Sequence, residues 1–219
     1  MLTASFWLQI GNGLLETLYM TLVSSLIAYV LGLPLGVLLV VTDKSGLVPR
    51  PTLNKVLNVA VNLLRSIPFL ILMIAVTPLS RALLGTTLGS TATIVPLVIG
   101  AAPFIGRVVE SSLREVNPGV VEAAVSMGAT PWQIITKVLL PEALPSLIVG
   151  AALSVTTILG YSALAGMLGG GGLGALAINY GYYRYMIDYM YVPLIVLVIV
   201  VQVFQLVGDV IARAVDKRK

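Results

Sequence analysis

Residues that could carry out chemistry are few in this chain, and their types exclude most catalytic sites. Its 219 residues include no histidine and no cysteine, and only 10% are charged. Without thiols or imidazoles, thiolate metal sites, cysteine nucleophiles and Ser-His-Asp triads cannot form. The apolar segments also hold no pair of acidic residues that could act as general acid and base, which argues against an intramembrane enzyme. We therefore expect no enzymatic activity, no metal site and no cofactor bound by this chain.

Two nucleotide-binding patterns can be tested directly. Gly169, Gly171 and Gly174 formally match the dinucleotide pattern G-x-G-x-x-G. That pattern needs a preceding strand and a following helix, whereas here it follows a long apolar stretch, so we expect a tight turn. The chain contains no Gly-Lys pair and therefore no P-loop. Any ATP hydrolysis must occur in a separate protein.

The polar stretch 117–141 begins with a turn and a short helix. Asn117-Pro118-Gly119 is a turn that ends the preceding element. Val120–Met127 is rich in good helix formers, and Gly128 stands where a left-handed residue would stop that helix.

A second short helix follows, which we expect over Pro131–Leu140. Thr130 is its predicted N-cap, with Pro131 in the first helical position and Gln133 completing a capping box. A loop that merely joined two helices would not need two caps and a sharp Gly-Ala-Thr corner. The stretch therefore predicts a rigid knuckle that docks into a cleft of a partner protein.

The composition indicates that the helices on either side of this knuckle lie in a membrane. Hydrophobic residues make up 58% and the mean hydropathy is +1.02, whereas soluble domains carry about 25% charged residues. We predict one membrane domain over residues 1–219 with five transmembrane helices. They are placed at residues 17–42, in the apolar part after Arg65, and at about Thr93–Val109, Leu144–Leu168 and Tyr189–Val207. An amphipathic lead-in before Arg65 is expected near the membrane interface.

Positive charge predicts the orientation of these helices. Lys and Arg gather in residues 43–65, 107–137 and the C-terminal tail, whereas the alternate segments hold only Arg81 and Arg184. The positive-inside rule then places the C-terminus in the cytoplasm and the N-terminus outside. No Lys or Arg precedes Lys44, so we expect the first apolar run to be a membrane helix and not a signal peptide.

The knuckle carries a motif with fixed gaps, E-A-A-x3-G-x9-I-x-L-P. It occurs as Glu122-Ala123-Ala124, Gly128 and Val138-Leu139-Leu140-Pro141, with Val in place of Ile. Together with IVPLVIGAAPFIGRVVE, LPEALP and GYSALAG, it resembles the permeases of D/L-methionine ABC importers. These are amino-acid members of the binding-protein-dependent transport inner-membrane component family, and the resemblance covers essentially the whole chain.

The resemblance implies an all-α integral membrane permease of an ABC type I importer, a multi-pass protein of the bacterial inner membrane that takes up methionine by alternating access. It also implies a homodimer in membrane lipid, two cytoplasmic ABC ATPase subunits that hold ATP and magnesium, and an extracytoplasmic methionine-binding lipoprotein, with no role for nucleic acid.

The resemblance also assigns residues. It gives Glu122, Ala123, Ala124, Gly128, Ala129 and Pro141 to coupling with the ATPase, and Ser162, Ala163 and Leu164 to the translocation path or gate. Arg65 either lines the path or anchors its helix at the headgroups.

Two alternative functions stay open at this point. The first is an ABC permease for a polar amino acid or another small solute, because substrate choice in such systems rests largely with the separate binding protein. The second is a secondary carrier or channel. Carriers usually place ionisable groups at the bilayer midplane, and the knuckle would have no role in one.

Two local features have simpler interpretations. The pairs Gly32/Gly36 and Gly166/Gly170 are candidates for close helix packing. A cluster of tyrosines near the last helix is typical of an interfacial aromatic belt, and contact with the docked binding protein is the alternative. The cluster consists of Tyr180, Tyr182, Tyr183, Tyr185, Tyr189 and Tyr191.

Overall fold

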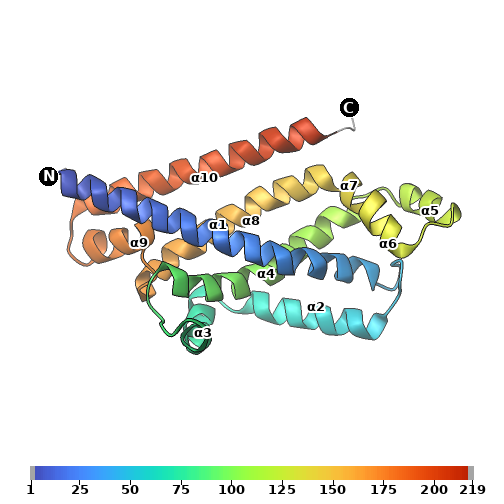
Figure 1. The fold of residues 1–219 in the computed structure, drawn as a ribbon, viewed down its shortest axis with the longest axis horizontal. Coiled ribbons are helices and arrows are strands. Elements are labelled where there is room, and N and C mark those ends of the chain that lie inside the picture. The colour runs from blue at the N-terminus through green and yellow to red at the C-terminus, as the bar shows by residue number, and fades with distance from the viewer. Residues whose placement is uncertain (1–2, 217–219) are drawn as a thin grey trace. The chain divides into compact units, whose positions relative to one another are not determined.

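The computed structural model describes residues 3–216, and all regular elements in that range are helices (Figure 1). Six described α-helices have at least 16 residues: α1 (Ala4–Val41), α2 (Pro51–Ser66), α3 (Phe69–Leu84), α4 (Ser90–Arg114), α8 (Leu144–Ala165) and α10 (Ile187–Val215). The remaining elements are short: α5 (Pro118–Ser126), α6 (Pro131–Ile134), the π-helix η1 (Ile135–Leu139), α7 (Leu140–Glu142), the 3-10 helix η2 (Gly166–Leu168), α9 (Gly172–Leu176) and the π-helix η3 (Ala177–Tyr182).

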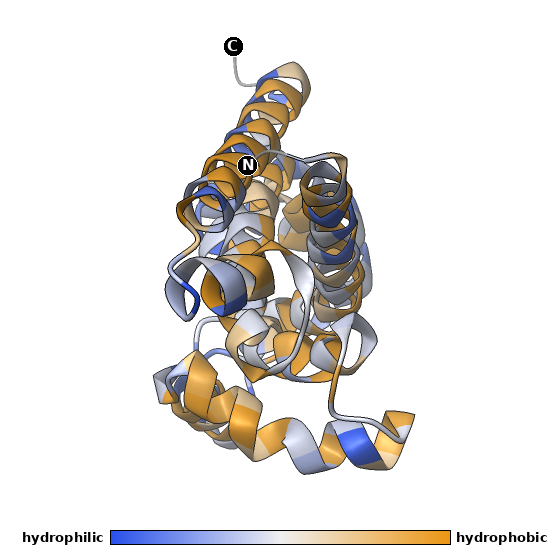
Figure 2. Ribbon diagram, turned by 90° about the vertical axis from the view of Figure 1, so that its left-hand side faces the viewer, coloured by the Kyte–Doolittle hydropathy of each residue, from blue (hydrophilic) through white to orange (hydrophobic). Residues whose placement is uncertain are grey.

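Four described segments are long and apolar enough to cross a membrane: α1, α4, Leu144–Leu168 and α10. Hydrophobic residues dominate the long helices (Figure 2). Each corresponds to one of the predicted spans, and three extend well beyond it at one or both ends. At 1.5 Å per residue, the 38 residues of α1 measure about 57 Å, against a hydrocarbon core of about 30 Å.

The remaining predicted span, the apolar part after Arg65, is shorter than the hydrocarbon core. It corresponds to α3, which has 16 residues and is about 24 Å long. α2 and α3 are long and apolar enough to cross a membrane only when taken together, and they are bent by 105° at the break between them. Pro68 lies at that break and explains it, because proline lacks an N–H and disfavours helical backbone at the residue before it. The described chain thus has four spans, or five if the bent pair is one span.

The chain divides into two compact units. The first comprises the described residues up to Ala28 with Ile67–Ala101 and Val155–Gln205, and the second comprises Tyr29–Ser66, Ala102–Ser154 and the described residues from Leu206. α1, α4, α8 and α10 contribute residues to both. One membrane domain over residues 1–219 stays a prediction, and Lys217, Arg218 and Lys219 of the basic tail lie outside the described residues.

In the first unit, α1 fixes the glycine-rich turn that precedes α9. The Gly172 N–H donates to Glu16 Oε2 at 2.6 Å, and the Leu173 N–H donates to Thr17 Oγ1 at 2.9 Å. Gly171 has φ +79° and ψ −162°, a conformation open essentially only to glycine. The predicted tight turn is confirmed, and residues of α1 hold it; that no dinucleotide binds there stays a prediction.

Close packing at the predicted glycine pairs is also confirmed. A Cβ on Gly32 would lie 2.6 Å from Ile105 Cγ2, and one on Gly36 would lie 2.6 Å from the Gly106 carbonyl oxygen, so α1 and α4 approach closely in the second unit. In the first unit, a Cβ on Gly166 would clash with the Ala175 nitrogen, and one on Gly170 would lie 2.6 Å from Thr93 Oγ1.

The predicted amphipathic lead-in is the helix α2, and its polar side faces the protein. The Asn54 side chain donates to the Leu39 carbonyl at 2.8 Å and lies 3.1 Å from Thr42 Oγ1. The opposite side is apolar and at least half exposed at Val56, Val59 and Leu63. An apolar outer face with an asparagine-lined inner face is typical of a helix that contacts lipid.

Candidate coupling loop and gate

The first helix of the knuckle, α5, is capped at both ends by local residues. Asn117 accepts the Gly119 N–H at 2.9 Å, and Pro118 occupies the first helical position. The sequence predicted a turn that ends the previous element, and the structure shows that the same turn starts α5. Gly128 has φ +78°, which confirms the predicted left-handed stop.

The second helix begins as predicted but continues differently. The capping box is present, with the Thr130 N–H donating to Gln133 Oε1 at 2.8 Å and the Gln133 N–H donating to Thr130 Oγ1 at 3.3 Å. One helix over Pro131–Leu140 is wrong, because the chain widens into a π-helix at η1. Pro141 explains this, since it has no N–H to donate to Lys137 and its ring would clash with that carbonyl. The Leu140 N–H instead donates to the Ile135 carbonyl, five residues back.

The candidate coupling residues divide into an anchoring set and an accessible set. Ala124 is buried and packs the loop, and Ala129 is half-buried. Glu122, Ala123, Gly128 and Pro141 are exposed.

Large apolar side chains are exposed next to these residues. Val125 is 53%, Met127 81% and Trp132 71% exposed, and a Cβ on Gly128 would meet no atom within 4 Å. Exposed apolar residues on a rigid, polar loop indicate a protein interaction surface.

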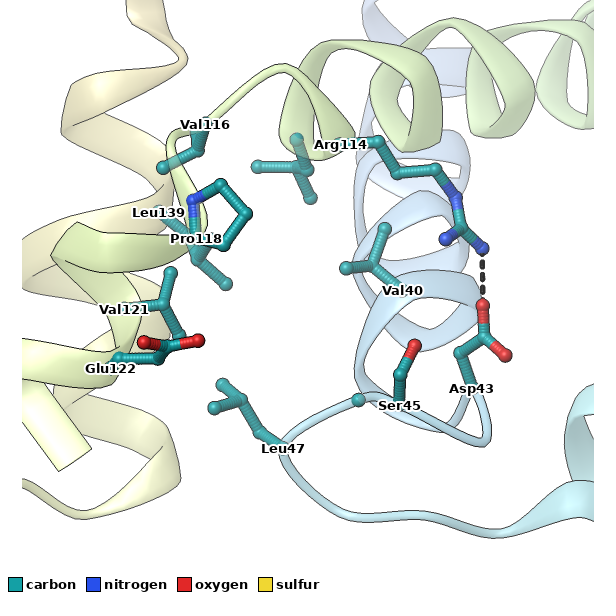
Figure 3. Close-up of a pocket in the computed structure, with 12 residues that line it drawn as sticks. Val40, Asp43, Ser45, Leu47, Arg114, Val116, Pro118, Val121, Glu122 and Leu139 are labelled. Carbon is teal, nitrogen blue, oxygen red and sulfur yellow. Dashed lines mark hydrogen bonds and ion pairs between the residues drawn. The ribbon is translucent and has the colours of Figure 1, made fainter.

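A cavity of about 240 Å³ lies between α5 and the end of α1. Glu122 and Val121 reach into it from α5, opposite Val40 and Leu47 (Figure 3). Arg114 and Asp43 line the same cavity and are joined by an ion pair.

An ion-pair network beside this cavity was missed by the sequence reasoning. Arg114 Nη2 lies 2.6 Å from Asp43 Oδ2 and 2.9 Å from Glu110 Oε1, and Arg107 Nη1 lies 2.6 Å from Glu110 Oε2. Arg107 Nη2 also donates to Asn62 Oδ1 at 2.8 Å, which adds α2 to the network. The spacing of Arg107, Glu110 and Arg114 places all three on one helix face, a signal that could have revealed the part of the network within α4.

The candidate gate residues lie in the first unit at the end of α8. Ser162 is 1% exposed and donates to the Leu159 carbonyl at 2.7 Å, so its hydroxyl is used within its own helix. Ala163 is half-buried against α9, where a Cβ on Gly174 would clash with its carbonyl oxygen. Leu164 is 41% exposed. A pathway role for these residues stays a prediction.

Arg65 is exposed at the last turn of α2. No ion pair or side-chain hydrogen bond involves it within residues 3–216. Its two interpretations, lining the path or anchoring the helix, both stay open.

The tyrosine cluster contains a packed and an exposed group. Tyr189 packs edge-on against Phe6 and stacks on Tyr180, with ring centroids 4.7 and 4.9 Å apart, and Arg184 lies over the Tyr180 ring at 4.6 Å. The exposed group is 59–87% exposed and consists of Tyr182, Tyr183, Tyr185 and Tyr191.

Long apolar helices with a double-capped, surface-exposed loop define an α-helical membrane protein with an exposed docking loop, and comparison with known proteins identifies its family. Residues 30–219 match the family described as binding-protein-dependent transport system inner membrane component, and the chain belongs to this family. It is therefore a multi-pass protein of the inner membrane, and its family consists of transport components.

Two relatives have names that specify a substrate. The probable D-methionine transport system permease protein MetI of Vibrio cholerae is 48% identical over 99% of this chain and 98% of its own length. The D-methionine transport system permease protein MetI of Escherichia coli K12 is 49% identical over 73% of each chain.

Two solved structures show the same fold. A chain of the MetNI methionine ABC transporter in inward-facing conformations matches with a TM-score of 0.97 and 46% identity, over 98% of this chain and 100% of that one. A chain of an amino acid ABC transporter with histidines matches at 0.73 and 19% identity, over 98% and 96%, and shows the fold alone.

Proposed function

We propose that this chain is the permease subunit of an ABC importer that takes up methionine by alternating access. The observation that carries the proposal is the near-complete match to a MetNI transporter chain at 46% identity. The substrate follows from relatives of nearly full length that are named for D-methionine transport.

The energy for transport comes from a separate ATPase. The chain has no P-loop, so ATP and magnesium bind at the ATPase and no cofactor binds here. Two permease chains form a homodimer that docks two cytoplasmic ATPase subunits, and an extracytoplasmic methionine-binding lipoprotein delivers the substrate. The match to a chain of the MetNI methionine ABC transporter supports assembly with other ABC transporter components.

The exposed part of the knuckle makes the contact with the ATPase. Met127 and Trp132 supply apolar area on either side of Gly128, and the capped helices hold them in fixed positions. When ATP closes the ATPase dimer, the two knuckles move together and the membrane helices open outward. The permease contributes contacts that differ between the two states, with Ser162, Ala163 and Leu164 near the gate.

The alternative, a permease for a polar amino acid or another solute, has weaker support. The amino acid transporter with histidines is only 19% identical, which carries no substrate information. Relatives close to half identical over nearly the whole chain are named for D-methionine instead.

The test is ATP-driven uptake of labelled methionine into proteoliposomes that hold this chain, its ATPase and its binding protein. Gly128→Trp places a large side chain on the docking surface, while Gly128→Asn is a matched control because asparagine tolerates left-handed backbone. We expect uptake by the wild type and by Gly128→Asn, and loss of uptake in a folded, dimeric Gly128→Trp.

Other outcomes separate the parts of the proposal. Uptake of a different amino acid alone would keep the ABC permease and discard methionine. Methionine uptake that persists without the ATPase would overturn the ABC mechanism.

A further inference from the structure

The proposed mechanism requires that movement of the knuckle reach the membrane helices, and the structure offers two routes in the second unit. One is the covalent connection through residues 115–117, which joins α5 to the end of α4. The other must reach the end of α1. There the cavity of about 240 Å³ separates Val121 and Glu122 of α5 from Val40 and Leu47. Apolar side chains across an open cavity transmit displacement poorly, because they lack partner atoms on the facing side.

Arg114 provides a direct link at the rim of this cavity. It is the last residue of α4, its Nη2 lies 2.6 Å from Asp43 Oδ2, and Asp43 follows the end of α1 by two residues. Glu110 Oε1 accepts hydrogen bonds from the same guanidinium, at 2.9 Å from Nη2 and 3.1 Å from Nε. Glu110 is 8% exposed and is itself paired with Arg107 at 2.6 Å.

The charges in this network balance, and its geometry is fixed on the α4 side. Two carboxylates and two guanidiniums alternate along Asp43, Arg114, Glu110 and Arg107. Arg114 donates to Glu110 Oε1 through both Nε and Nη2, a pair of coplanar donors that a lysine cannot reproduce. The Arg114 guanidinium therefore points toward Asp43 in a fixed direction. A contact that transmits movement requires such a fixed direction.

We propose that Arg114 is a positioning residue that couples displacement of the ATPase-docking knuckle to α1 through its ion pair with Asp43. The ion pairs of Arg114 with Asp43 and Glu110 are here called the α1–α4 junction. This inference rests on the proposed function, because it assigns a role in coupling to residues that touch neither ATP nor substrate.

The readout is the number of ATP molecules hydrolysed per substrate molecule imported, measured with the complete transporter in proteoliposomes. Asp43→Asn keeps the shape of the side chain and removes its charge, so we expect the ratio to rise by about fivefold, the lower end of typical coupling effects. Asp43→Glu restores the charge and is expected to return the ratio toward the wild type.

The matched control is Arg50→Gln. Arg50 lies in the same loop, is exposed, and has no side-chain ion pair among the described residues. We expect its ratio to equal that of the wild type. Arg114→Lys provides a second test that keeps the charge, and we expect an intermediate ratio because one ammonium cannot reproduce the pair of coplanar donors.

Two results would overturn the role of the junction. One is an unchanged ratio in Asp43→Asn, which includes the case in which hydrolysis and import fall by the same factor. The other is a rise of the ratio in Arg50→Gln as large as the rise in Asp43→Asn. If the wild type imports a different amino acid, the ratio is measured with that solute and tests the junction independently of methionine. Uptake by the wild type without the ATPase would instead overturn the proposed function, and the junction with it.

Discussion

Asp43 is half-buried, and the pKa of its carboxyl depends on its neighbours. The hydrogen bond from Arg114, followed by the Lys44 backbone N–H, holds the pKa of the Asp43 carboxyl below its ordinary value. A folded-state pKa below the unfolded value of about 3.9 gives stabilisation that is present above that value and is lost as pH falls through the folded pKa.

We therefore predict that the difference in thermal unfolding midpoint between the wild type and Asp43→Asn is constant from about pH 6 to 8. It should narrow only in strongly acidic buffer. Midpoints measured in detergent across this range check the prediction, and a difference that narrows near neutral pH would contradict it.

Two buried threonines on α1 allow a matched comparison of hydrogen bonding. Thr17 Oγ1 accepts the Leu173 N–H, whereas Thr21 Oγ1 has no hydrogen-bond partner among the described residues, and both residues are at most 2% exposed. Thr17→Val should destabilise the protein by about 1–3 kcal/mol because it leaves a buried N–H unpaired. Thr21→Val should be neutral or stabilising. Thermal unfolding midpoints of the two purified variants check this prediction. An equal fall of the midpoint in both would show that the exchange of hydroxyl for methyl, and not the lost hydrogen bond, is responsible.

At the scale of elements, the contact of α1 with α4 depends on the lack of side chains at their crossing. Gly36→Ala would place a Cβ 2.6 Å from the Gly106 carbonyl oxygen. This oxygen belongs to the backbone of α4 and cannot easily move aside. Overpacking of this kind costs about 1–3 kcal/mol. Gly11→Ala makes the same change on the same helix with no atom within 4 Å, so it should be neutral or stabilise by up to about 1 kcal/mol. We predict a lower unfolding midpoint for Gly36→Ala alone; similar midpoints would mean that the helices separate at little cost.

The elements also show what a sequence can predict. The capping box at Thr130 and the left-handed Gly128 were predictable because caps depend on neighbouring residues. The bend at Pro68 was not, since membrane helices tolerate proline when neighbours re-satisfy the backbone. The ion pair of Arg114 with Asp43 joins residues 71 positions apart, and no local pattern specifies such a pairing. Which side of α2 faces the protein likewise depends on its tertiary partners.

At the scale of the whole molecule, the topology depends on whether the bent pair α2 and α3 crosses the membrane. The ion pair of Asp43, just after α1, with Arg114, at the end of α4, predicts that it does, because the two residues must lie on the same side. With five spans the termini lie on opposite sides, and with four they lie on the same side. Ser45 lies in the loop before this pair and Thr86 in the loop after it, and both are exposed. If the pair is one span, these two residues are on opposite sides of the membrane.

The absence of cysteine makes the test clean, because each introduced thiol is the only one in the chain. The charge distribution predicts that a membrane-impermeant thiol reagent added to cells with an opened outer envelope labels Thr86→Cys but not Ser45→Cys. Inverted membrane vesicles should give the reverse result. Tyr182→Cys, in the second segment predicted to lie outside, serves as the control and should follow Thr86→Cys. Labelling of Ser45→Cys and Thr86→Cys from the same side would mean that α2 and α3 enter and leave the membrane on one face. The odd number of spans, and with it the placement of the two termini on opposite sides, would then be wrong.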